Sequence, residues 1–246
     1  MKITFLGTSH GIPAADRYCS STMIETGGKL YFIDAGAPLI DLLLRRGADL
    51  NSVKAIFTTH LHSDHTDGVL GLAGLFSWHY KRTSVDIYLT EPKGVEVFSE
   101  LLKTTIGELD EQRVRFRLMT EDTVWEDENI RVTPFPTRHL AYANRPAYSY
   151  LIEAEGKKLL FSGDLSGRLA EDDFPKYALE NEVDLMVCEM AHFGVEHAAP
   201  YLEKCRAKEL LFNHVYPLEK LRQIDELGCQ FGYPIRTVED GEEVEL

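Results

Sequence analysis

The sequence has few cysteines and no long apolar run, and these absences exclude several classes of protein. The 4 cysteines among 246 residues form no C-x-x-C pair, which argues against a closed zinc site built from thiolates. We expect all of them to be reduced and mostly buried: Cys19, Cys188, Cys205 and Cys229. No apolar run approaches the roughly 20 residues that a membrane helix needs. No basic, apolar leader opens the chain either, so we expect a cytoplasmic protein without a membrane span.

Basic residues are also few compared with acidic residues. The chain has 26 Lys and Arg residues against 40 Asp and Glu residues, for a formal net charge of -14. An acidic surface repels polynucleotides, and binding along several phosphates needs a basic track that this sequence lacks. A small or short anionic substrate is therefore favoured over extended nucleic acid, which stays the less favoured alternative.

Length and composition indicate one globular domain over residues 1–246. The 27.9 kDa chain is 44% hydrophobic and 27% charged, and no Pro- or Ser-rich linker divides it. Strand and helix patterns alternate along it, which is typical of a layered α/β (α+β) fold. Strands are predicted at residues 1–6, 21–25, 29–34, 54–57, 85–89, 114–119, 130–135, 148–153, 158–161, 184–188 and 209–212. Helices are predicted at residues 39–46, 68–80, 94–104, 195–206 and 217–228.

The segment at residues 58–65, TTHLHSDH, places three imidazoles and a carboxylate within six positions, directly after an apolar run. In an extended segment His60 and His62 share one face, while Leu61 points to the core. Asp64 and His65 follow a turn and point to a second position, at the first turn of a helix if one begins at residue 66. The pattern predicts a loop that serves two metal ions. The alternative is a polar, His-rich loop without metal.

Further candidate ligands follow later strands. They are His139, Asp164, the pair Glu189 and His192, and His214. Taken alone, His139 could be an ordinary surface histidine, and Asp164 a turn residue or helix N-cap. In layered α/β folds, however, ligands gather where strands end at one edge of a sheet. We therefore expect these residues to lie together.

As a set, these residues resemble the metallo-β-lactamase superfamily. The resemblance covers nearly the whole chain and implies a four-layer αββα sandwich of two mixed sheets flanked by helices. It also implies two divalent metal ions, with zinc the first expectation and manganese and iron as alternatives. The implied ligands are His60, His62 and His139 for one ion, Asp64, His65 and His214 for the other, and Asp164 for both. Asp34, at a strand end, resembles the family carboxylate that orients the motif loop.

Within the superfamily, the chain resembles ribonuclease Z and related phosphodiesterases. The shared residues are Phe5-Leu6-Gly7-Thr8, Gly11, Pro13, Arg17, Ser20-Ser21 and the segment at residues 68–72. Three features depart from that pattern. Two predicted strands and a turn fill residues 140–163, where ribonuclease Z carries the arm that grips transfer RNA. Cys188 replaces the histidine of the His-Glu-Ala-Thr motif, and Ser63 replaces a glycine.

These features predict a hydrolase in which a hydroxide shared by two metal ions attacks a small or short phosphodiester. The expected catalytic residues are Asp64, Asp164, Glu189 and His192. His192 or His10 could protonate the leaving group, and Glu189 could orient such a histidine. The expected substrate-binding residues are His10, Arg17, Arg138 and Arg145, because arginine can hold a phosphate bidentately; surface solvation is the alternative for each. Phe76, Trp78 and Tyr80 are expected in the core.

Other functions remain open at this stage. The same metal centre could hydrolyse a lactone or thioester, and a non-catalytic metal-binding accessory protein is a further alternative. A redox di-iron role is disfavoured, because such relatives carry a glutamate at the position of His62. A homodimer is possible, since relatives often dimerise.

Overall fold

The structure, a computed structural model, describes residues 1–12, 14–106, 109–228 and 230–246. Pro13 and Cys229 lie outside the described residues, so the expectations for both stay predictions. The chain forms two compact units. The first unit contains Met1–Gly7, Gly11–Thr120 and Asp240–Glu245, and the second contains Thr8–His10, Glu121–Glu239 and Leu246. The assignment of residues 1–246 to a single domain stays a prediction.

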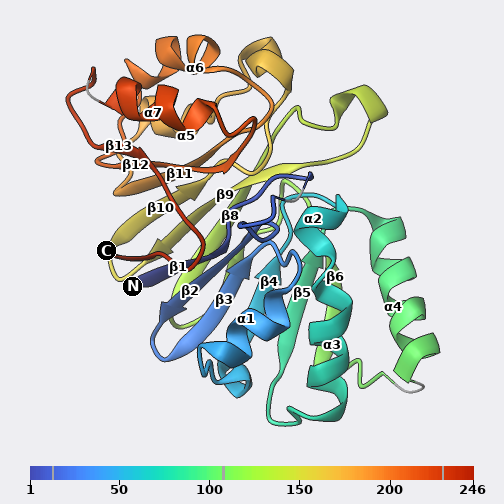
Figure 1. Cartoon of the computed structure of the whole chain (residues 1–246). Helices are drawn as coiled ribbons and strands as arrows, with labels where there is room; N and C mark the ends of the chain where they lie inside the picture. Colours follow the sequence, from blue (N-terminus) through green and yellow to red (C-terminus); the bar gives the residue numbers. More distant parts are fainter. Residues whose placement is uncertain (13, 107–108, 229) are drawn as a thin grey trace. The chain divides into compact units, whose positions relative to one another are not determined.

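The first unit contains a mixed sheet of seven strands (Figure 1). The four strands at one side of the sheet pair antiparallel, and β3 to β6 pair parallel. At the β2–β3 turn, Gly27 and Gly28 have φ of 57° and 71°, a conformation that glycine adopts at little cost. In sheet order the strands are β14 (Glu243–Glu245), β1 (Lys2–Gly7), β2 (Ser21–Thr26), β3 (Lys29–Ile33), β4 (Val53–Phe57), β5 (Val85–Leu89) and β6 (Val114–Leu118).

Three helices cover this sheet with apolar side chains. Leu43 of one helix, Phe76 of the next and Leu102 of the third are buried in one core with strand residues such as Ile56. A Cβ at Gly68, just before the middle helix, would lie 2.7 Å from the main-chain oxygen of Ala35, so glycine permits this close approach. The helices are α1 (Leu39–Arg45), α3 (Val69–Trp78) and α4 (Pro92–Ile106), joined by the short α2 (Ser63–Thr66) and η1 (Leu50–Ser52).

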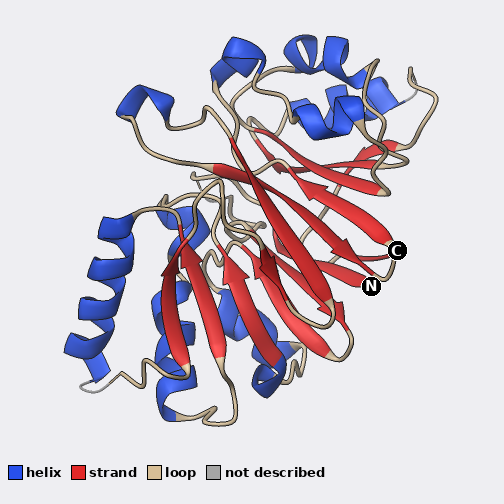
Figure 2. Cartoon of the chain, turned by 180° about the vertical axis from the view of Figure 1, so that it is seen from behind, coloured by secondary structure: helices blue, strands red, loops and turns tan. Residues whose placement is uncertain are grey.

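The second unit contains another mixed seven-stranded sheet (Figure 2). Its strands β7 to β10 pair antiparallel, and β10 to β13 pair parallel. In sheet order they are β13 (Ile235–Thr237), β12 (Leu210–Val215), β11 (Leu185–Met190), β10 (Lys157–Phe161), β9 (Tyr148–Ala154), β8 (Ile130–Pro136) and β7 (Trp125–Glu126).

Apolar residues of three helices form the core of the second unit with this sheet. Ala178, Leu202 and Ile224 of successive helices are buried with strand residues such as Met186 and Phe212. The helices are α5 (Lys176–Glu180), α6 (Val195–Leu202) and α7 (Lys220–Gly228), with η2 (Ala141–Ala143) and η3 (Gly167–Asp172) in the connections. No helix within the described part of the chain combines the length and the apolar character of a membrane span.

The two units share one strand pattern, which determines where the polar strand ends lie. In each, an antiparallel meander leads into three further parallel strands. Parallel neighbours end at the same edge of a sheet, so β3 and β4 bring Asp34 and the motif loop together. By the same rule β8, β10, β11 and β12 end at one edge of the second sheet.

Most predicted elements are present, and four details are corrected. Trp78 is 55% exposed, whereas Phe76 is buried as expected, because Trp78 is the last residue of α3 and projects beyond the core. Asp64 and His65 lie inside a short helix, α2, that begins at Ser63. Glu189 lies within β11, and α6 ends at Leu202. The two strands and the turn that were predicted within residues 140–163 are confirmed, since β9 and β10 pair as an antiparallel hairpin.

Candidate metal centre

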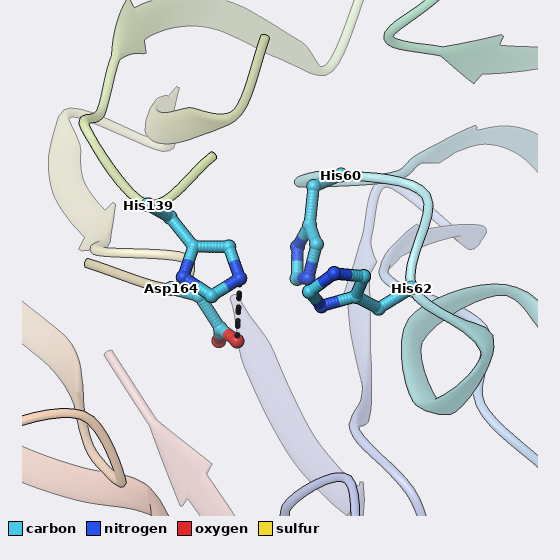
Figure 3. Close-up of side chains that lie close together, drawn as sticks. All are labelled: His60, His62, His139 and Asp164. Carbon is cyan, nitrogen blue, oxygen red and sulfur yellow. Dashed lines mark ion pairs between the residues drawn. The ribbon is translucent and has the colours of Figure 1, made fainter. Parts of the chain in front are cut away.

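In the first unit, the motif loop brings its imidazoles and its carboxylate together. His60 is fully buried, and its ring centroid lies 4.5 Å from that of His62 and 4.2 Å from that of His65. Figure 3 shows the rings of His60 and His62 facing each other edge to face. Nε2 of His65 lies 3.3 Å from Oδ2 of Asp64. The intervening Leu61 packs against the first core, as the extended pattern predicts.

Asp34 anchors this loop from the end of β3. Its Oδ1 accepts a hydrogen bond from the main-chain N–H of Thr59 at 2.7 Å, and its Oδ2 accepts one from Nδ1 of His65 at 2.7 Å. The Thr59 hydroxyl lies within hydrogen-bond distance of both carboxylate oxygens and 3.1 Å from Nδ1 of His60. Asp34 has φ of 59°, a left-handed conformation that Asp tolerates better than most residues. One buried carboxylate thus orients two motif histidines, directly or through Thr59.

The backbone around Asp34 also holds the second half of the loop. The N–H of Ala35 donates to the carbonyl of His65 at 2.8 Å. At Gly36, a Cβ would overlap the main-chain oxygen of Asp64, so only glycine permits this close approach. The chain therefore passes directly against the loop that carries Asp64 and His65.

In the second unit, one oxygen of Asp164 lies among three imidazoles. Oδ2 of Asp164 is 3.3 Å from Nε2 of His214, 3.7 Å from Nε2 of His139 and 3.9 Å from Nδ1 of His192. Figure 3 draws the contact between His139 and Asp164 as a dashed line. Asp164, His139 and His214 are buried, while His192 is partly exposed. Nε2 of His139 and Nε2 of His214 thus lie around one buried carboxylate oxygen at the spacing that ligands of a shared cation adopt, whereas Nδ1 of His192 lies closer to Glu189.

The main chain determines which ring nitrogen each histidine offers. Nδ1 of His139 lies 3.3 Å from the carbonyl of Leu165, and Nδ1 of His214 lies 2.9 Å from the carbonyl of Ser9. Because a carbonyl only accepts, each Nδ1 carries the proton and each Nε2 is left as a metal-binding lone pair. The same holds for His65, whose Nδ1 faces Asp34. Imidazole nitrogen and carboxylate oxygen fit zinc, manganese or iron in both units.

The buried Glu189 carboxylate contacts the segments that carry Asp164 and His192. Its carboxylate accepts from the N–H groups of Leu165 at 2.8 Å, Ala191 at 2.6 Å and His192 at 3.1 Å. Its Oε1 also lies 2.8 Å from Nδ1 of His192. The ligand atoms of Asp164, Glu189 and His192 all lie within 4.8 Å of one another. Because the two Glu189 oxygens already accept four hydrogen bonds, Glu189 orients the main chain at Leu165 and Ala191 and the ring of His192.

The expected substrate-binding residues fall into different surroundings. Arg138 and Arg145 line one cavity of about 800 Å³ in the second unit, and the Arg138 guanidinium pairs with Glu171 at 3.2 Å. The ring of His10 lies 3.9 Å from that of Tyr216 and 6.4 Å from that of His214. Arg17 belongs to the first unit. The two cavity arginines are thus brought together, whereas His10 packs beside a ligand histidine.

Three contributors to the site were missed in the sequence. Thr59 is adjacent to the motif, and a hydroxyl beside a ligand histidine was a usable signal. Asp173 accepts from the N–H of Arg138 and, at 2.7 Å, from that of Ser166, and so ties together the loops that carry His139 and Asp164. Burial raises the pKa of the Asp173 carboxyl. The third residue is Lys220, which donates to main-chain carbonyls on both sides of His192. The sequence around Lys220 gives no indication of this contact.

The three described cysteines belong to none of the groups of candidate metal ligands. Cys188 is buried, and burial raises the pKa of its thiol well above the ordinary value, so it stays a neutral side chain. Cys19 and Cys205 are also free but only partly buried, so the prediction of mostly buried thiols is correct in full for Cys188 alone.

Comparison with known proteins places this geometry in a family. Residues 1–205 match the family model described as anti-Pycsar protein Apyc1. Ribonuclease Z from Shouchella clausii is 31% identical over 182 residues, which cover 72% of this chain and 56% of that protein. The aligned chain therefore spans little more than half the length of that relative.

Solved structures are similar to the whole chain. The metallo-β-lactamase fold protein YhfI from Bacillus subtilis has a TM-score of 0.79 at 19% identity, covering 100% of this chain and 98% of its own. The short form of human tRNase Z has a TM-score of 0.77 at 21% identity, covering 100% and 99%. The predicted metallo-β-lactamase fold is confirmed. The chain belongs to the anti-Pycsar protein Apyc1 family, near the ribonuclease Z and phosphodiesterase branch of the metallo-β-lactamase superfamily.

Proposed function

We propose that this protein is a metal-dependent phosphodiesterase that acts on a small or short phosphodiester. The observation that carries the proposal is the surroundings of Asp164, whose Oδ2 lies 3.3 Å from Nε2 of His214 and 3.7 Å from Nε2 of His139. Such a cluster of donors is suited to a cation and has no role in packing the core. Ribonuclease Z relatives and the structure of a diphosphatase from the PhnP family with the same fold support the reaction class.

Seven residues would hold two divalent ions, for which zinc is our first candidate. When bound, such ions supply a nucleophile at neutral pH and neutralise charge on the attacking and leaving oxygens. As the family resemblance implies, the first ion would take His60, His62 and His139, the second Asp64, His65 and His214, and Asp164 would serve both. Within each unit the anchored Nδ1 atoms support these assignments, because they make Nε2 the ring nitrogen that carries the lone pair in His65, His139 and His214.

His192 is our candidate for the proton donor to the leaving oxygen. It is partly exposed, lies 3.9 Å from Asp164 and is held by Glu189 at 2.8 Å. A donor beside the reacting phosphorus must be reachable by substrate yet fixed in direction, and His192 meets both needs. Arg138, which adjoins the ligand His139 in the sequence, and Arg145 would contact the phosphate or its substituent.

Two features support a small substrate. The net charge of -14 disfavours extended nucleic acid. The β9–β10 hairpin occupies the segment where ribonuclease Z carries its transfer RNA arm.

The test compares three substrate classes on one metal-loaded preparation: a simple aryl phosphodiester, a lactone and a thioester. We expect metal-dependent hydrolysis of the phosphodiester with at least about a hundredfold preference in kcat/KM, which is about 2.8 kcal/mol. Faster hydrolysis of the lactone or thioester would assign the site to acyl substrates. Metal binding without any turnover would identify an accessory protein.

A further inference from the structure

Lys220, the first residue of α7, reaches back to the loop that follows β11. Its Nζ donates to the main-chain carbonyls of Met190 at 2.9 Å, Ala191 at 3.3 Å and Phe193 at 2.6 Å. An ammonium group has three donors, so this loop uses all of them. The three carbonyls flank His192 on both sides.

Glu189 holds the same loop through the opposite kind of backbone group. Its carboxylate accepts from the N–H groups of Ala191 and His192, while the Lys220 ammonium donates to the carbonyls of their neighbours. The carbonyl of His192 itself accepts from the N–H of Arg168 at 3.0 Å. An anion and a cation thus fix the main chain on which the His192 ring is mounted, and Glu189 also fixes the ring.

The position of Lys220 is not explained by helix stability. A cation at the N-terminus of a helix is unfavourable, because the helix dipole is positive there. Burial lowers the pKa of the Lys220 ammonium, and the nearby Glu189 and Glu196 raise it in part. Within the described chain, the ammonium contacts carbonyls and has no carboxylate within ion-pair distance. Partial burial of a cation costs free energy. Here the Lys220 ammonium stabilises the ordered loop around His192.

We propose that Lys220 is a positioning residue that holds His192 in place for proton transfer to the leaving group, a role that rests on the proposed function. In that reaction an oxygen from water bonds to phosphorus as the bond to the leaving oxygen breaks. The leaving oxygen takes a proton from His192, and the proton of the attacking water passes to solvent. Lys220 itself touches neither substrate nor metal ligand.

The experiment compares leaving groups, because a poor leaving group needs the proton and a good one does not. The substrates are methyl 4-nitrophenyl phosphate and methyl phenyl phosphate, and the variants are Lys220→Met and Lys220→Arg. Lys204→Met, which changes an exposed lysine of the same unit, is the matched control. General acid catalysis contributes about 10²–10⁴-fold, so partial misplacement should cost about 10–100-fold with the phenyl ester. With the nitrophenyl ester we expect a loss of less than about threefold.

Two further readouts separate positioning from a merely structural role. The metal content of Lys220→Met should equal that of the wild type, and Lys220→Arg should recover most of the activity on the phenyl ester. In a His192→Ala background, Lys220→Met should cause little further loss, because the two residues act through one group. Thermal melting identifies any variant that unfolds at the assay temperature, and Lys220→Arg then carries the test.

The outcomes distinguish this inference from the proposed function. If the wild type hydrolyses both esters and Lys220→Met loses the same factor on each, the role of Lys220 is refuted and the phosphodiesterase stands. A loss that persists in the His192→Ala background refutes it as well. If the wild type hydrolyses neither ester, the proposed function fails, and this role fails with it.

Discussion

Replacing Asp34 by Asn should weaken metal binding without unfolding the protein. Asn accepts the φ of 59° at this position, so the backbone can stay in place. One side-chain oxygen can still accept from the N–H of Thr59, but the amide N–H₂ replaces the oxygen that accepts from Nδ1 of His65 at 2.7 Å. Two donors then face each other, and His65 must change its tautomer or rotate. The other tautomer carries its proton on Nε2, and a rotation moves Nε2 away, so either change weakens metal binding.

The size of the effect follows from the bond that is lost. A hydrogen bond to a charged group contributes about 1.5–3 kcal/mol. The corresponding loss is about 10–100-fold in metal affinity, which is the range typical for groups that orient a metal ligand. Asp34→Ala should also strain the left-handed backbone and lower the melting temperature.

The assay is competitive zinc titration of chelator-stripped protein. Asp49→Asn is the matched control, since Asp49 is an exposed aspartate of the same unit that accepts from Asn51 and Ser52. We expect wild-type zinc affinity in Asp49→Asn and a clear loss in Asp34→Asn. Unchanged affinity in Asp34→Asn would refute the argument that Asp34 orients His65.

Three further predictions concern metal and stability. Asp164→Ala should abolish turnover and lower the metal content. Its melting temperature should stay close to that of the wild type, because Asp164 lies at the sheet edge and outside the apolar cores. Turnover at the wild-type rate would show that Asp164 does not belong to the site. Chelation should abolish hydrolysis, and added zinc or manganese should restore it; activity that survives complete removal of metal would contradict the metal centre. Asp86→Asn should lower the free energy of unfolding by about 1–3 kcal/mol at pH 7, because Asp86 accepts from Arg115 and Arg117 at 2.6 Å each. Burial raises the pKa of Asp86, but the hydrogen bonds from both arginines lower it overall, so this stability is present above about pH 4 and is lost as the pH falls through the lowered pKa. Urea unfolding should show a smaller difference at pH 3 than at pH 7, and an equal difference at both values would contradict it.

Much of the fold was predictable because it is encoded in local patterns. The glycines at positions 27 and 28 indicated a hairpin turn, and alternation of apolar residues located the flanking strands. The grouping of His60, His62, Asp64 and His65 could be predicted, because these residues are so close in sequence that a single loop places their side chains together. Short elements such as β7, with two residues, carry too few residues to show any period.

The supporting residues were harder to predict, because their partners are distant in sequence. Lys220 contacts carbonyls of a loop 27–30 residues earlier, and nothing at the start of α7 indicates this. Asp173 binds the N–H of Arg138, 35 residues away. The left-handed backbone of Asp34 and His214, with φ of 59° and 52°, is equally invisible in a pattern of residue types. Such contacts depend on tertiary packing, which a local pattern does not record.

The most direct test of the central claim is steady-state kinetics of the metal-loaded protein on a small aryl phosphodiester and on precursor transfer RNA, at two ionic strengths. The net charge of -14 and the hairpin in place of the arm predict a kcat/KM for the small substrate at least equal to that for the RNA. They also predict only a weak dependence on salt. Tight, salt-sensitive binding and selective 3′ cleavage of precursor transfer RNA would contradict this account.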